Sequence, residues 1–280
     1  MPAAAPLLMN AAINIGIAVG ASVLSNLISP KTSTAKPGQR QMSFDLTVGE
    51  NVPVSTVFGR GRVEGHLIFG QEYGKDNSYA KFVFELGKGH FDALEGVLVD
   101  DVVTTLSGSN SDMHGYVVDR FKVNSDNEPA ANGTPYMWVK FYNGAPGQTA
   151  DAGLITAAPT RWTVNHKLSH TAYVVVTIRQ NADLFGSSLP RLSYIVRGMK
   201  LYDWRYDSTM PGGSGSQRWN DPTTWAWTEN PAVIKYNFRR GIWLNGIRVL
   251  GMGMSHHAQD MTYYTAAANA RFVRQHNAQV

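Results

Sequence analysis

Residues 172–179 read AYVVVTIR, and this stretch decides the fold class. The residues from Val174 to Ile178 are all β-branched, and such side chains favour extended backbone over helix. A nearly continuous apolar run of this length is typical of a strand buried inside a sheet. Residues 79–86 (YAKFVFEL) alternate between polar and apolar side chains instead, which predicts a half-buried strand.

The sequence around these two strands predicts a fold that is mainly β with some α (α+β). Glycines are frequent, 27 in 280 residues, and aromatic residues recur in short segments, a pattern typical of strands joined by many turns. The adjacent Asp100 and Asp101 are expected to form a hairpin turn within 94–106. Further strands are expected at 43–47, 52–58, 62–69, 115–123, 136–142, 192–196 and 200–203.

Two helices are expected to close the chain. Asn230 is a suitable N-cap and Pro231 a suitable first helical residue, so we expect a helix that runs through Ile242. Asp260 could cap a second helix, with Tyr264, Ala267 and Arg271 at helical spacing. Because this pattern reaches the end of the sequence, we expect the chain to continue into a longer polypeptide.

The N-terminus is apolar. Residues 7–28 contain no charge, Pro30 follows them, and Gly16 and Gly20 form a GxxxG pair that lets helices approach closely. No Lys or Arg precedes this run, which disfavours a cleaved secretory signal. Two interpretations of this run remain, a membrane span and a helix buried in an assembly. The polar residues inside the run favour the buried helix. A mixed interpretation has the helix sheltered in a particle until it meets a membrane.

These patterns divide the chain into four parts. Residues 1–30 are the apolar N-terminal helix, and residues 31–41 are a polar linker. Residues 42–205 are the β-rich region, with 107–160 as an insertion. Residues 206–280 are a loop followed by the helical region.

The composition excludes some chemistry. There is no cysteine, so disulfides, thiolate catalysis and cysteine-based zinc sites are excluded. Only 16% of the residues are charged, so much of the surface is neutral, as in proteins that face other subunits. The net charge of +4 is too mild to argue for nucleic acid binding.

No catalytic, cofactor or metal residue is predicted. The sequence contains no GxSxG, HExxH, P-loop or GxGxxG motif, and the glycine-rich residues 59–62 are expected to be a turn. His166 and His170 have a spacing that could pair on a metal, but no third ligand lies nearby. Trp219, Trp225 and Trp227 could stack on sugars or bases, but packing of a loop onto the body of the protein is favoured.

Four segments carry a resemblance to a known family. Residues 189–203 (LPRLSYIVRGMKLYD) resemble the "PR, apolar strand, RG, K, YD" segment of tail tip or baseplate hub proteins. This group serves long-tailed bacteriophages and gene transfer agents, and includes the tip attachment protein of lambda-like phages. Residues 227–232 (WTENPA) resemble the helix start that follows in the family. Residues 49–69 resemble an earlier "GE, P, FGR" region, and 264–272 a later helix.

The resemblance implies a virion structural protein rather than an enzyme. It implies barrel-like hub domains of short strands, a homotrimer at the distal end of the tail, and gating of DNA ejection during host attachment. The implied partners are the distal tail, tail tube and tape-measure proteins and the tail fibre. Residues 7–28 are expected to contact a membrane on ejection, and no sequence-specific nucleic acid binding is expected. The alternatives are a tail-associated cell-wall hydrolase and a membrane-anchored binding module.

Overall fold

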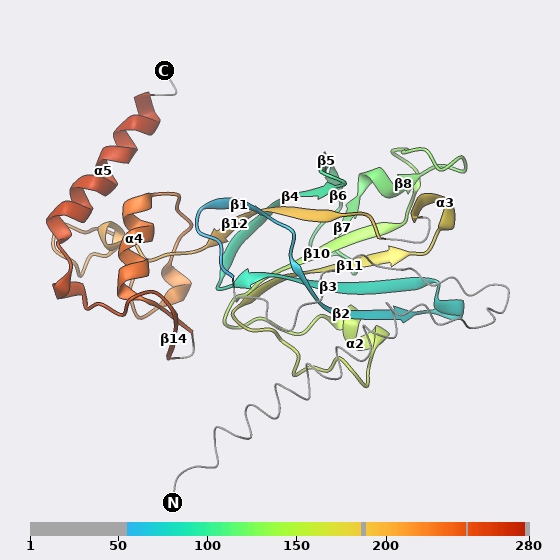
Figure 1. The fold of residues 1–280 in the computed structure, drawn as a ribbon, viewed down its shortest axis with the longest axis horizontal. Coiled ribbons are helices and arrows are strands. Elements are labelled where there is room, and N and C mark those ends of the chain that lie inside the picture. The colour runs from blue at the N-terminus through green and yellow to red at the C-terminus, as the bar shows by residue number, and fades with distance from the viewer. Residues whose placement is uncertain (1–54, 186–188, 245, 278–280) are drawn as a thin grey trace, which may run out of the picture.

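The computed structural model describes residues 55–277 apart from 186–188 and 245. The predicted N-terminal helix, the linker and the strand at 43–47 lie outside the described residues. Strands dominate the described part, and helices are few and gathered mainly near the C-terminus (Figure 1). The predicted mainly β, α+β class is therefore confirmed.

Two antiparallel sheets form the body of the molecule. The larger has the order β2-β3-β11-β10-β7-β6 and the smaller β1-β12-β4-β5. The larger sheet contains β2 (His66–Tyr73), β3 (Tyr79–Lys88), β6 (Leu106–Ser107), β7 (Tyr116–Val118), β10 (Met137–Asn143) and β11 (Thr171–Arg179). The smaller sheet contains β1 (Arg60–Val63), β4 (Phe91–Val99), β5 (Val102–Thr104) and β12 (Leu192–Met199).

The two sheets are joined at both ends by extended chain. β1 runs into β2 through Glu64 and Gly65, and β5 runs into β6 through Thr105, so the chain passes from one sheet to the other at each corner. Hydrogen bonding does not continue around these corners, and both sheets stay open. The described strands therefore form a two-sheet sandwich, where the sequence analysis expected barrel-like domains.

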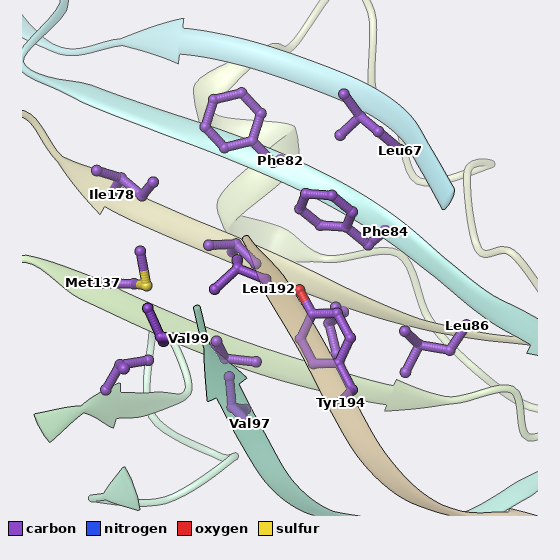
Figure 2. Close-up of a cluster of buried hydrophobic side chains, with 14 of the residues drawn as sticks. Leu67, Phe82, Phe84, Leu86, Val97, Val99, Met137, Ile178, Leu192 and Tyr194 are labelled. Carbon is purple, nitrogen blue, oxygen red and sulfur yellow. The ribbon is translucent and has the colours of Figure 1, made fainter. Parts of the chain in front are cut away.

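The main core lies between the sheets. Phe82, Phe84 and Ile178 of the larger sheet face Val97 and Tyr194 of the smaller one (Figure 2). All five side chains are almost fully buried. Burial of such side chains contributes about 1.5–3 kcal/mol each, which makes this layer the main source of stability in the sandwich.

The outer face of the larger sheet is also covered. Val83, Tyr173 and Val175 pack there against Leu154 of α2 (Ala152–Ala157) and against Trp162. The expectation that β3 would be half-buried is therefore wrong, because the excursion between β10 and β11 covers its second face. The strand at 172–179 is confirmed as β11, which lies between β3 and β10 and has eight consecutive buried residues.

The C-terminal part has its own core. α4 (Pro231–Arg240) and α5 (Met261–Asn277) pack around Tyr202, Trp204, Tyr236 and Tyr264. The N-caps predicted at Asn230 and Asp260 are confirmed by bonds from Ala232 N at 3.0 Å and from Tyr263 N at 3.2 Å.

The first of these helices is shorter than predicted. It ends at Gly241, which has a φ of 94°, and Ile242 begins the hairpin of β13 (Ile242–Leu244) and β14 (Ile247–Leu250). Within the described range, no helix has the length and apolar character needed to cross a membrane.

Small elements fill the remaining connections. They are η1 (Lys75–Asn77), η2 (Asp119–Phe121), β8 (Lys122–Val123), β9 (Thr134–Pro135), α3 (Ala182–Phe185), η3 (Trp204–Tyr206), η4 (Pro222–Thr224) and η5 (His256–Ala258).

Candidate functional site

Parts of three of the four family-like segments meet at one place, where the sandwich joins the helical part. β1 pairs with β12, and the chain before β1 continues the contact, with Gly198 N donating to Gly59 O at 2.8 Å and Met199 N donating to Val57 O at 2.8 Å. The Trp227 indole donates to the same Gly59 oxygen at 3.2 Å. We call residues 57–62, 195–203 and 227–232 the junction.

Two glycines allow this close approach. A Cβ on Gly198 would lie 2.1 Å from the carbonyl oxygen of Val57, a distance that no side chain can tolerate. Gly59 has a φ of 67°, in the left-handed region that favours glycine. The glycines of the "FGR" and "RG" patterns therefore have a structural reason, the crossing of the chain before β1 over the end of β12.

Arginines of the same two sequence patterns form ion pairs on the outer side of the junction. Arg197 Nη2 lies 2.6 Å from Asp92 Oδ2, and Arg60 Nε lies 2.5 Å from Glu95 Oε2. The Arg197 guanidinium also lies over the Trp227 ring, 5.2 Å from its centroid. Since these side chains are partly exposed, each ion pair contributes only about 0–1 kcal/mol, and the network mainly fixes the orientation of Trp227.

A cavity of about 260 Å³ opens beside the junction. Its lining includes Asp203, Arg205, Gln217 and Trp227. The polar groups are already engaged, because Arg205 Nη2 lies 2.6 Å from Asp203 Oδ2 and Gln217 accepts from Asp203 N at 2.8 Å. The arrangement holds the chain that enters the helical part.

Buried polar side chains tie the junction to the helices. Asn237 is fully buried, donates to Tyr202 O at 2.7 Å and to Val233 O at 2.9 Å, and accepts from Tyr202 N at 3.3 Å. Tyr202 donates its hydroxyl to Asp207 at 2.7 Å, and burial together with this bond raises the Tyr202 pKa. Burial alone would raise the pKa of Asp207, but bonds from Thr209 and Tyr202 outweigh it and lower that pKa.

The three tryptophans do not share one surface. The ring centroids of Trp219 and Trp225 are 5.6 Å apart, and both rings pack against the helical core. The Arg240 guanidinium lies 3.5 Å from the centroid of the Trp219 ring. Trp227 lies at the junction instead. The tryptophans therefore pack the loop onto the body of the protein, the interpretation that the sequence analysis favoured over stacking on sugars or bases.

A second polar group, not found from the sequence, lies under α2. Lys81 is 1% exposed and donates to Thr177 Oγ1 at 2.8 Å. Burial lowers the Lys81 pKa to about 8, Asp151 opposes this shift, and Lys140 adds to it. Asp151 accepts from Leu154 N at 2.5 Å and from the Tyr142 hydroxyl at 2.7 Å. The group fastens α2 onto the sheet.

The other residues considered for chemistry are separated. His166 accepts from Thr163 N at 2.9 Å in a loop, and His170 lies in the turn before β11 with a φ of 59°. Asp100 and Asp101 form the β4–β5 turn, as predicted, with φ values of 51° and 65°. Among the described residues, no group of three or more His, Asp or Glu is placed to hold a metal ion.

Comparison with known proteins adds little to this description of the junction. No family model matches the chain, and no curated protein matches it. One chain in a solved structure described as "Virion of native gene transfer agent (GTA) particle" is similar at 19% identity and a TM-score of 0.35. The match covers 85% of this chain and 48% of that chain, so this chain spans about half of its length. A likeness this weak transfers neither fold nor function.

Proposed function

We propose that this protein is a structural component of a phage-like virion, the central hub at the distal end of the tail. The observation that carries the proposal is the junction. The family-like segments 49–69, 189–203 and 227–232 are far apart in sequence, and their parts 57–62, 195–203 and 227–232 are in mutual contact. Motifs that contact one another in the folded chain support a common architecture with hub proteins better than motifs that lie apart in the structure would.

The parts of the chain fit this role. The sandwich, which ends with β12 at Met199, has its large sheet covered on both faces, and the helical part is a second core attached through the junction. In the proposal, the sandwich faces the distal tail ring and the tail tube, and the helical part leads toward the fibre or tip. The tape-measure protein would end inside a ring of three copies, and opening of that ring would let DNA pass.

The mass of the purified chain tests the trimer. We expect light scattering to give three times 30.7 kDa, with a ring-like outline in negative stain. A monomer at every concentration would contradict the trimeric part of the proposal. Variants at the junction, such as Gly198→Ala, are expected to lose the ring together with the fold, whereas variants in the exposed 163–170 loop keep both.

A further inference from the structure

The β13–β14 hairpin exposes an apolar surface that the hub role does not require. Phe238 is 38% exposed, Trp243 46%, Ile247 63%, Val249 45% and Met252 59%. Ile242 and Leu250, at the base of the hairpin, reach the helical core. Figure 1 shows that β14 projects from the helical part and lies away from both sheets.

The exposed side chains lie on both faces of the hairpin. Trp243 is paired with Arg248 across the two strands, so these two side chains share one face. Ile247 and Val249 flank Arg248 in β14 and therefore point to the opposite face. A two-stranded hairpin is marginally stable alone in water, and here the described residues leave apolar side chains largely exposed on both faces.

The charge around the hairpin has one sign. Between Asn230 and Gln259 the sequence contains Lys235, Arg239, Arg240 and Arg248 but no Asp or Glu. Arg248 donates to Met252 O at 2.8 Å, and Arg239 donates to the Tyr264 hydroxyl at 3.1 Å, so both cations are held beside the apolar residues by neutral groups. The region therefore complements an anionic partner.

We propose that the β13–β14 hairpin inserts into an anionic lipid surface. Apolar side chains that include a tryptophan, with cations and no anions beside them, are the combination that membrane-surface elements use. The interfacial layer of a membrane can contact the side chains on both faces of a hairpin at once, which a flat protein surface cannot do, while the open edges of the hairpin stay in the hydrated headgroup region. Two-fold self-association would bring like charges together, and duplex DNA offers phosphate but little cover for Ile247, Val249 and Met252.

The test uses the full chain and vesicles. We expect cosedimentation with vesicles of equimolar phosphatidylcholine and phosphatidylglycerol, weaker binding at high salt, and little binding to phosphatidylcholine alone. The double variant Ile247→Asp/Val249→Asp should weaken partitioning by at least about tenfold. The matched control is Val102→Asp/Val103→Asp on β5, where both valines are as exposed as Ile247, and it should leave binding within about twofold.

Several results would overturn the proposal. Equal binding by the wild type and the hairpin variant would assign the contact elsewhere, including residues 7–28, and a variant lacking residues 1–30 identifies that case. Failure of the wild type to bind either kind of vesicle would leave a protein or DNA as the partner. Circular dichroism confirms that each variant is folded. The result does not depend on the hub role, because the vesicle assay contains no other virion protein.

Discussion

Replacement of Trp227 by alanine is the sharpest test of the junction. Three interactions are lost: the indole hydrogen bond to Gly59 O at 3.2 Å, the Arg197 contact at 5.2 Å and the partial burial of the ring. The Gly59 carbonyl keeps its hydrogen bond from Gly198 N, so the variant leaves no buried acceptor unpaired. Loss of the indole hydrogen bond should therefore lower the free energy of unfolding by only about 0.5 kcal/mol. The cation–π contact adds about 0.5–1 kcal/mol, and the lost burial adds about 1 kcal/mol.

The expected loss for Trp227→Ala is therefore about 2 kcal/mol in the free energy of unfolding. Urea denaturation followed by far-UV circular dichroism measures it as a lower midpoint at an unchanged slope. Trp227→Phe keeps a ring under Arg197 and loses the hydrogen bond, so it should cost about 1 kcal/mol or less. Val164→Ala, at a residue 65% exposed, is the surface control. A loss below about 0.5 kcal/mol for Trp227→Ala would refute the view that this side chain fastens the helical part to the sandwich.

Three further predictions follow from other buried contacts. Gly198→Ala should lower the yield of folded protein or cost more than about 3 kcal/mol, because its Cβ would meet the Val57 carbonyl at 2.1 Å; a stable variant, measured by thermal melting, would contradict the crossing described. Asn237→Ala should cost about 2–4 kcal/mol in urea, since it leaves the backbone N–H and carbonyl of Tyr202 without their Asn237 partner in the helical core; a loss as small as that of a surface variant would contradict this. Because the Lys81 pKa is lowered from 10.5 to about 8, the unfolded state binds more protons between these values, so stability should rise as the pH goes from 8 toward 10. Lys81→Met should remove this rise; denaturation midpoints for both proteins from pH 7 to 10 decide the matter.

The main strands and the helix starts could be predicted because local signals specify them. The strands expected at 55–58 and 200–203 are wrong, and the turn expected at 59–62 lies mostly in β1. The β-branched run of β11 and the alternation in β3 mark extended backbone, and Asn230-Pro231 marks the start of α4. The error at the end of α4 also had a local signal, since Gly241 follows two arginines and is a common helix stop. The apolar Ile242 continued the helical spacing and hid that signal.

Other features depend on contacts between distant segments. The second buried face of β3 arises because the excursion between β10 and β11 folds over it, and no pattern within 79–88 contains that information. The Lys81–Asp151 group was missed for the same reason, although a lysine inside an apolar strand was a signal that it needed a partner. At the junction, the residues were identified through a resemblance, while their contact was visible only in the structure.

The location of the protein in purified particles tests the central proposal most directly. Antibodies raised against the folded chain, detected with gold in electron micrographs of tailed particles, should label one site at the distal end of the tail. Mass spectrometry of the same particles should find a few copies of the chain in each. Absence of the chain from purified particles, or labelling along the tail or on the capsid, would contradict the hub account.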